Sequence, residues 1–294
     1  MKIIKWKDLF NWGGLGIGIL GVVFVVRKLI EYSNQINISA LTGLSLFFLF
    51  GLLLTYCFAN ILLALAWHDL LQFLKVETTK KWAIQTYGIA QIGKYVPGNI
   101  FHFASRQAIG QAAGLPTLPF AKSVVWEIGL IAATGTLFAV LIIPLFWVQI
   151  TYQIALVLFI ILLFCSVLCA NHWIGPKAGS ALKLYALFLI ISGIIFNGVL
   201  IVATSVQPEF SFVFIGIIGV YVVAWLAGLI TPGAPAGIGV RELVFLALLH
   251  SVISEGELLK AIILGRFVTI GGDVLFYIFS IVLRFNKKRE EYLK

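Results

Sequence analysis

The sequence predicts an all-α integral membrane protein with about eight transmembrane helices, plus re-entrant or broken segments near residues 82–118 and 232–253. Three observations predict this class. Of the 294 residues, 61% are hydrophobic and 11% are charged, whereas a soluble domain is about half apolar and about one quarter charged. The mean hydropathy is +1.05. The apolar residues also occur in runs near the length of about 20 residues that a membrane-spanning helix needs.

Eight apolar runs bounded by charged or turn residues are the candidate membrane spans. They cover residues 10–30, 40–66, 120–147, 152–170, 184–206, 211–231, 240–253 and 261–283. The first run follows three lysines, as in a signal peptide, but Arg27, Lys28 and Glu31 come after it, where a cleavage site needs small residues. We therefore expect this run to remain as the first helix, and residues 1–294 to form a single polytopic membrane domain.

Two regions interrupt these runs. Residues 82–118 are apolar enough to enter a membrane but contain several Gly, Pro and charged residues, so we expect a re-entrant segment. The run 240–253 is short for a crossing, and a stretch rich in Pro and Gly precedes it. Broken helices at this depth are tolerated only inside protein or beside water. The candidate backbone positions at the two breaks are Pro97, Gly98, Pro232, Gly233, Gly237 and Gly239.

Lys and Arg residues in the short loops predict the orientation, because they collect on the cytoplasmic side. If the N-terminus is cytoplasmic and residues 82–118 return to the side they entered from, most of the loop Lys and Arg residues lie inside. Only Arg27, Lys28 and Lys260 then fall outside, beside acidic residues. We therefore predict a multi-pass protein of the cytoplasmic membrane with both termini in the cytoplasm.

Eight ionisable residues remain within the apolar part of the chain. They are Lys94, Arg106, Lys122, Glu127, Arg241, Glu242, Arg266 and Asp273. A charge at the centre of a bilayer costs about 2.5–3.5 kcal/mol on insertion scales, so such residues usually face a protein interior or a wet cavity. Snorkelling at a helix end is the alternative for Lys94 and Lys122. The eight residues together suggest one shared site, and we expect His102 to join it, because His102 is four residues from Arg106 and so on the same helix face.

Five of these eight residues are basic and three are acidic, so the predicted site has a formal excess of two positive charges. Arg266 and Asp273 are seven residues apart, which places them two turns apart on one helix face. The excess of positive charge indicates an anionic ligand, such as the phosphate of a lipid.

The two breaks resemble each other. Gly93-x-x-x-Pro97-Gly98 precedes Arg106, and Gly228-x-x-x-Pro232-Gly233 precedes Arg241, with identical offsets. Paired breaks of this kind indicate a transport site, because broken helices present backbone N–H groups and half-helix dipoles to a substrate. They also suggest a weak internal repeat with halves near 40–150 and 184–283, although two Pro-Gly turns with a chance downstream Arg are the alternative. The predicted topology places both breaks toward the cytoplasmic side, without the inversion that inverted repeats require.

The sequence contains few signals for catalysis. No P-loop, no His-Glu-x-x-His and no Gly-x-Ser-x-Gly pattern occurs, the histidines lack metal-ligand spacing, and the three cysteines lack C-x-x-C spacing. We therefore expect no metal, no cofactor and no nucleic-acid partner, and an enzyme is the weaker class.

The motifs together resemble a known family, the transmembrane region of lysylphosphatidylglycerol synthases. The resemblance spans roughly residues 10–283 and rests on Gly93-Lys94-Tyr95-Val96-Pro97-Gly98, Ser123 with Glu127, Pro232-Gly233 through Arg241-Glu242, and Arg266-x-x-Thr269-x-x-x-Asp273. That family includes the flippase part of multiple peptide resistance factors and the membrane part of some archaeal glycosyltransferases. The resemblance implies a polytopic fold with re-entrant segments and translocation of a phospholipid.

This sequence departs from the family pattern in two places. Ala236-Gly237-Ile238-Gly239 stands where members often have Gly-Gly-x-Gly, and Ile128 stands where an arginine often follows the glutamate. Both departures bear on the identity of the substrate. The chain also lacks the soluble aminoacyl-transfer domain, so we do not expect it to make the lysyl lipid itself.

We therefore expect a stand-alone lipid flippase or scramblase that translocates an anionic phospholipid or a polyprenyl-phosphate-linked lipid. In this hypothesis Arg106, Arg241 and Arg266 hold the phosphate, because the arginine fork binds phosphate oxygens in pairs. The carboxylates balance their charge. The alternatives are a secondary transporter of a small anionic solute, a lipid-modifying membrane glycosyltransferase, and a partner subunit of a separately encoded lipid-modifying enzyme.

Overall fold

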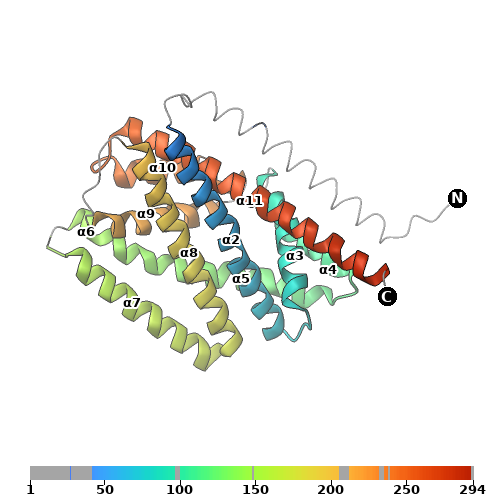
Figure 1. Cartoon of the computed structure of the whole chain (residues 1–294). Helices are drawn as coiled ribbons and strands as arrows, with labels where there is room; N and C mark the ends of the chain where they lie inside the picture. Colours follow the sequence, from blue (N-terminus) through green and yellow to red (C-terminus); the bar gives the residue numbers. More distant parts are fainter. Residues whose placement is uncertain are drawn as a thin grey trace.

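The structure is a computed structural model that describes residues 27, 42–96, 100–147, 149–204, 212–231, 235–237 and 239–292. All regular secondary structure in these residues is helical (Figure 1), which confirms the predicted all-α class. Except for Arg27, the predicted first span at 10–30 lies outside the described residues.

The described chain contains six helical stretches that are long and apolar enough to cross a membrane. They are α2 (Gly43–Phe73), α5 (Thr117–Leu137) continued by η3 (Phe138–Ile142) and α6 (Ile143–Phe146), α7 (Tyr152–Cys169) continued by η4 (Ala170–Ile174), α8 (Pro176–Ala203), α9 (Val213–Ile230) and α11 (Glu255–Tyr292). The short elements are α3 (Lys80–Gln91), η2 (Ile92–Tyr95), α4 (Phe101–Ala112), η5 (Pro235–Gly237) and α10 (Val240–Leu249). A multi-pass membrane protein follows from these helices.

Local sequence explains several of the helix boundaries. The hydroxyls of Thr42, Thr79 and Thr151 accept hydrogen bonds from backbone N–H groups in the first turns of α2, α3 and α7, the role that Thr has at an N-cap. Pro176 occupies the first position of α8, where its missing N–H costs nothing.

One predicted span is wrong. The run 240–253 forms only the ten-residue helix α10, which is about 15 Å long at the helical rise of 1.5 Å per residue. This is about half the thickness of a bilayer core. The predicted count of eight crossings is therefore not reached within the described residues.

Helices α2 and α8 run antiparallel and form the centre of the bundle. At one end, Lys177 at the start of α8 forms an ion pair with Asp69 near the end of α2, at 3.0 Å. At the other end, Gly198 of α8 packs against Leu52 of α2. We call the end where α2 finishes and α8 starts the lysine end, because five exposed lysines lie there: Lys75, Lys80, Lys81, Lys177 and Lys183.

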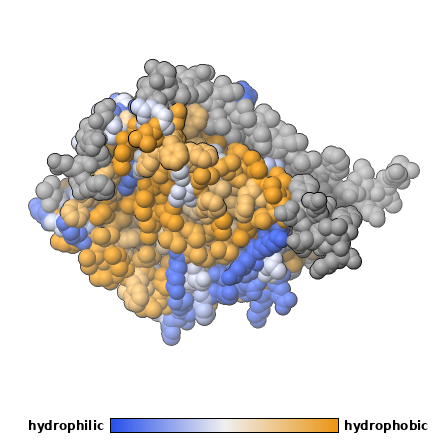
Figure 2. Space-filling view, in the orientation of Figure 1, coloured by the Kyte–Doolittle hydropathy of each residue, from blue (hydrophilic) through white to orange (hydrophobic). Residues whose placement is uncertain are grey.

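Figure 2 shows the surface that this bundle presents, a broad apolar band with hydrophilic residues gathered along one edge. Helix α7 contributes strongly to the apolar surface, since Ile154, Val157, Ile161 and Phe164 are each more than half exposed. Large exposed apolar surfaces of this kind are expected where side chains face lipid. Five of the lysines that the sequence predicted to be cytoplasmic therefore lie together at the lysine end.

The first break is a hairpin that enters from the lysine end. Trp82 at the start of α3 contacts the ring of Phe120 with a centroid distance of 6.0 Å, and Gly110 near the end of α4 packs against the same ring. The two helices therefore begin and end at the same side, as the re-entrant interpretation of residues 82–118 predicted.

The second break is a hairpin that enters from the opposite end. Near the end of α8, Asn197 donates a hydrogen bond to the backbone oxygen of Phe214 at the start of α9, at 3.0 Å. Its neighbour Phe196 stacks on Phe245 of α10, with a centroid distance of 4.6 Å. Elements α9, η5 and α10 therefore form a second hairpin.

The tips of the two hairpins meet on α11. Tyr95 of η2, Ala236 of η5 and Ile270 of α11 form a small buried apolar cluster separate from the main core. The predicted topology, which placed both breaks toward one side, is corrected here. It treated 240–253 as a crossing, whereas α10 only returns the second hairpin to the end where α9 began.

Each hairpin has the same kind of close backbone contact between its two arms. A Cβ on Gly93 would lie 2.9 Å from the backbone nitrogen of His102, and a Cβ on Gly228 would lie 2.9 Å from Cα of Gly237. In both cases the contact is made with the residue nine positions later, where the chain returns. Each glycine therefore lets the two arms of its hairpin approach closely. The opposed directions match an inverted arrangement, and the halves 40–150 and 184–283 stay a prediction.

These contacts predict how adding a side chain at Gly228 affects the stability of the protein. Gly228→Ala places a methyl group against the backbone of Gly237 and the side chain of Arg241, and overpacking costs about 1–3 kcal/mol. We expect a lower unfolding temperature for the purified protein in detergent. The control is Gly129→Ala, since nothing lies within 4 Å of a Cβ at Gly129. Equal unfolding temperatures for the two variants would contradict the close contact.

Candidate functional site

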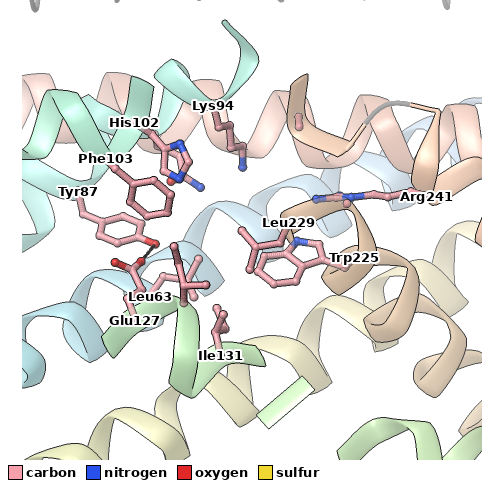
Figure 3. A pocket seen from close by; sticks show the side chains of 14 residues that line it. Leu63, Tyr87, Lys94, His102, Phe103, Glu127, Ile131, Trp225, Leu229 and Arg241 are labelled. Atoms are coloured by element: carbon pink, nitrogen blue, oxygen red, sulfur yellow. Dashed lines mark hydrogen bonds between the residues drawn. The ribbon is translucent and has the colours of Figure 1, made fainter. Parts of the chain in front are cut away.

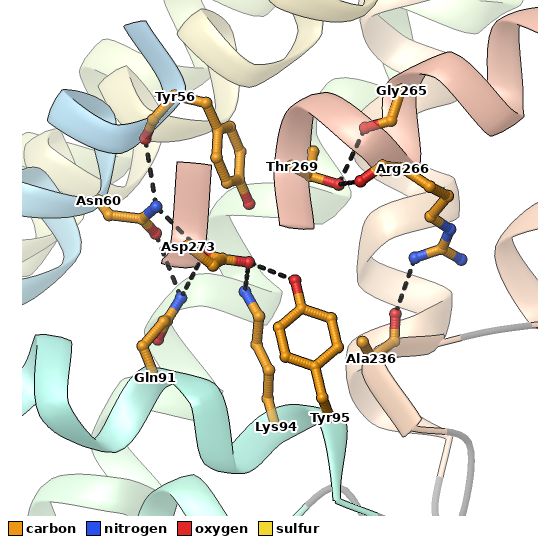
Figure 4. Close-up of polar contacts among 10 residues, drawn as sticks. All are labelled: Tyr56, Asn60, Gln91, Lys94, Tyr95, Ala236, Gly265, Arg266, Thr269 and Asp273. Atoms are coloured by element: carbon orange, nitrogen blue, oxygen red, sulfur yellow. Dashed lines mark hydrogen bonds and ion pairs between the residues drawn. The ribbon is translucent and has the colours of Figure 1, made fainter. Parts of the chain in front are cut away.

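Except for Lys122, the charged residues predicted to share a site lie around the place where the two hairpin tips meet α11 (Figures 3 and 4). Six of them form three ion pairs, Lys94 with Asp273, Arg266 with Glu242, and Arg106 with Glu127. A charged group in a membrane interior needs such a partner, because leaving one charge unpaired costs several kcal/mol.

Asp273 holds the tip of the first hairpin. Its side chain is fully buried, and Oδ2 lies 2.6 Å from Lys94 Nζ and accepts a hydrogen bond from the Tyr95 hydroxyl. The other oxygen, Oδ1, accepts hydrogen bonds from the amides of Asn60 and Gln91, each at 3.2 Å. Four donors from three elements thus surround one carboxylate of α11 (Figure 4).

Arg266 holds the turn of the second hairpin. Its Nε and Nη2 donate to Glu242 Oε1 at 2.9 Å and 2.6 Å, and Nη1 donates to the backbone oxygen of Ala236 at 3.1 Å. Glu242 Oε2 also accepts from the N–H of Gly239 at 2.7 Å, which closes the first turn of α10. Gly237 and Gly239 have φ values of 71° and 87°, a backbone conformation that favours glycine.

Arg106 and Glu127 form a third pair that is almost completely buried. Arg106 Nη1 lies 2.8 Å from Glu127 Oε2, with side chains 2% and 6% exposed. The guanidinium lies over the rings of Tyr87 and Trp67, at 4.5 Å and 5.0 Å from their centroids. The Tyr87 hydroxyl also donates to Glu127 Oε1 at 2.9 Å. This arrangement leaves Arg106 enclosed by aromatic rings.

Arg241 differs from the other three cations. Among the described carboxylates none forms an ion pair with it, and its Nε is buried without a hydrogen-bond partner. Its guanidinium lies 5.7 Å from the centroid of the Trp225 ring, a cation–π distance. Its neighbour in sequence, Glu242, points to a different partner, as adjacent positions on a helix must.

A small cavity lies between the hairpins. Its volume is about 60 Å³, several times the roughly 10–15 Å³ that one water molecule requires. Some lining residues, among them Trp225, are apolar, and the polar part of the lining comes from Tyr87, Gln91, Lys94, His102, Glu127 and Arg241. Figure 3 shows Lys94 and Arg241 extending toward this space from different hairpins. The cavity therefore has a mixed polar and apolar lining and is able to hold water.

His102 is the remaining predicted residue. It is 9% exposed, lines the cavity, and its Nδ1 has no hydrogen-bond partner. A buried polar atom without a partner is costly unless a water or ligand satisfies it. His102 is thus a ready hydrogen-bonding group in the cavity wall.

The structure changes the predicted roles in two ways. The prediction assigned three arginines to the phosphate, but Arg106 and Arg266 are paired with Glu127 and Glu242. The cations that line the cavity are therefore Arg241 and Lys94. Lys122 is exposed on α5 and outside the cluster, as the snorkelling alternative had it. The remaining cluster has four cations and three carboxylates, an excess of one positive charge instead of two.

Several residues of the site were missed in the sequence. Asn60 and Gln91 bind Asp273, Tyr87 binds Glu127, and Trp225 lies beneath Arg241. An amide within an apolar run, as at Asn60, was the available signal, because amides in a membrane helix need partners. Four of the predicted backbone positions, Pro97, Gly98, Pro232 and Gly233, lie outside the described residues.

Among the residues that the structure describes, no group of three or more His, Cys, Asp or Glu side chains could hold a metal ion. No known protein-family model matches the chain, and no curated protein sequence matches it. The family resemblance therefore rests on the sequence motifs and stays a prediction.

The burial of the Arg106–Glu127 ion pair predicts that removing one of its charges lowers the stability of the protein strongly. Glu127→Gln leaves the Arg106 guanidinium buried without a carboxylate, and breaking such a pair costs about 3–5 kcal/mol. We expect a strongly lowered unfolding temperature in detergent. The double variant Arg106→Met with Glu127→Gln should recover much of the loss, since it removes the unpaired charge. Glu77→Gln, at an exposed carboxylate, is the control. A double variant less stable than Glu127→Gln would refute the enclosed ion pair.

Proposed function

We propose that this protein is a lipid flippase or scramblase that translocates an anionic phospholipid or a polyprenyl-phosphate-linked lipid across the cytoplasmic membrane. The observation that carries the proposal is Arg241, a guanidinium without a carboxylate partner at a polar cavity between two opposed hairpin tips. An arginine kept in this position at membrane depth is a functional group by default.

The chemistry of the cavity favours a phosphate-containing ligand. Arginine stays charged in a dry site and binds phosphate oxygens through its planar fork. Lys94 supplies a second cation, and the unpartnered Nδ1 of His102 supplies a hydrogen-bonding group. A phosphate placed here would bridge the two hairpins, because Lys94 belongs to the first and Arg241 to the second.

The surroundings of the cavity favour a lipid. The face of the bundle in Figure 2 has a broad apolar band, so acyl chains can remain in the bilayer while a head group enters between the hairpins. A cavity of about 60 Å³ holds only a few water molecules. Entry of a head group therefore requires one hairpin to move away from α11.

A second candidate is a secondary transporter of a small anionic solute. The small volume of the cavity favours it, because a compact anion needs less movement of the hairpins than a lipid head group. The sequence has no P-loop, so in both proposals the movement is either downhill or coupled to an ion or to the membrane potential.

The test is transport by the purified protein in liposomes. Two substrates are compared, fluorescent phosphatidylglycerol, followed by its loss of access to an external quencher, and radiolabelled inorganic phosphate, followed by uptake. We expect movement of the lipid alone, and a fall of at least about ten-fold in Arg241→Gln, because hydrogen bonds to charged groups contribute about 1.5–3 kcal/mol. The matched control is Lys122→Gln, which removes one exposed positive charge from α5 and should leave the rate unchanged.

The outcomes separate the candidates. Uptake of phosphate without movement of lipid would favour the small-anion transporter. Movement of lipid at the same rate in Arg241→Gln and in the unmodified protein would remove the proposed site.

A further inference from the structure

The charge of the cluster is unusually well defined. Its charged members are partly or fully buried, and three carboxylates are each within 2.8 Å of a cationic nitrogen. Bulk water and salt therefore screen these charges much less than they screen surface charges. Any ligand that enters the cavity must fit the charge that remains.

The pairs leave one positive charge for a ligand. Arg106 and Arg266 neutralise Glu127 and Glu242, Lys94 neutralises Asp273, and Arg241 remains. No described carboxylate is bonded to His102, which shares the cavity lining with the cation Lys94, so we count it as neutral.

A second negative charge on the ligand would have no further unpaired cation of the cluster to bind. It could be paired only by drawing Lys94 away from Asp273. Asp273 is 0% exposed, and its other ligands, Tyr95, Asn60 and Gln91, are neutral donors. A fully buried carboxylate that loses its cation incurs a penalty of several kcal/mol.

From this charge balance we propose that the cavity selects a head group with one negative charge, a phosphodiester, and rejects the doubly charged phosphomonoesters. The inference rests on the proposed function and names its substrate class. Phosphatidylglycerol and polyprenyl-phosphate-linked sugars are phosphodiesters, whereas phosphatidic acid and unsubstituted polyprenyl phosphate are monoesters. The phosphodiester lies between Arg241 and Lys94, and Lys94 keeps its contact with Asp273.

The experiment compares two lipids that differ by one methyl group. Dihexanoyl phosphatidylmethanol is a phosphodiester with one charge, and dihexanoyl phosphatidic acid is a monoester with two charges at pH 8.5, since the second pKa of a phosphomonoester lies near about 6–7 in solution. Binding of each to the purified full-length protein in detergent is measured by calorimetry. We expect phosphatidylmethanol to bind at least about ten-fold more tightly.

Charge variants then test the cause of the preference. Asp273→Asn and Glu242→Gln each remove one carboxylate, on either side of the site, and raise the excess to two positive charges. We expect both to lose or reverse the preference, and the use of two positions guards against a variant that does not fold. Glu77→Gln removes an exposed carboxylate outside the cluster and should keep the preference.

The binding results separate a failure of the charge-matching inference from a failure of the proposed function. Tighter binding of phosphatidic acid to the unmodified protein, or an unchanged preference in both folded variants, overturns the charge-matching inference and leaves lipid transport standing. Binding of neither lipid, together with no lipid movement in liposomes, overturns the proposed function itself.

Discussion

The pairing of buried charges on α11 is the interaction on which the rest of the structure depends. Asp273 binds Lys94 of the first hairpin, and Arg266 binds Glu242 of the second, at 2.6 Å in both cases. Neither hairpin tip is a continuous helix, so its backbone and charged side chains would be costly in hydrocarbon without these partners. One helix thus provides the anchor for both tips, and the cavity exists because the tips are held side by side.

This arrangement gives the two hairpins equivalent positions. Each enters from its own end of the bundle, returns through a close glycine contact, is held by one ion pair to α11, and contributes one cation to the cavity. In the proposed function one hairpin moves away from α11, which would break the ion pair that this hairpin makes with α11. The enclosed Arg106–Glu127 pair supports the wall of the first hairpin.

The sequence predicted the class of fold and most of the site, for reasons that are local. Apolar run length identified the six long helices, and the cost of charge in hydrocarbon identified Lys94, Arg241 and Asp273 as members of one cluster. Which charges pair with which depends on contacts between segments far apart in the chain, as with Asn60 and Asp273, and no spacing rule contains that information. The direction of the second hairpin was missed because α10 is apolar enough to be read as a crossing, although its ten residues are too few.

Arg241 is the one cation of the described cluster without a carboxylate partner, and the proposed function rests on it. The proposed binding of phosphate by Arg241 and Lys94, the apolar surface and the opposed hairpins all agree with movement of a singly charged lipid. The most direct measurement is an experimental structure of the protein with phosphatidylglycerol bound in a lipid nanodisc. The account predicts the lipid phosphate within hydrogen-bonding distance of both Arg241 and Lys94. A phosphate found only at the exposed lysines of the lysine end, with the central cavity occupied by water alone, would contradict it.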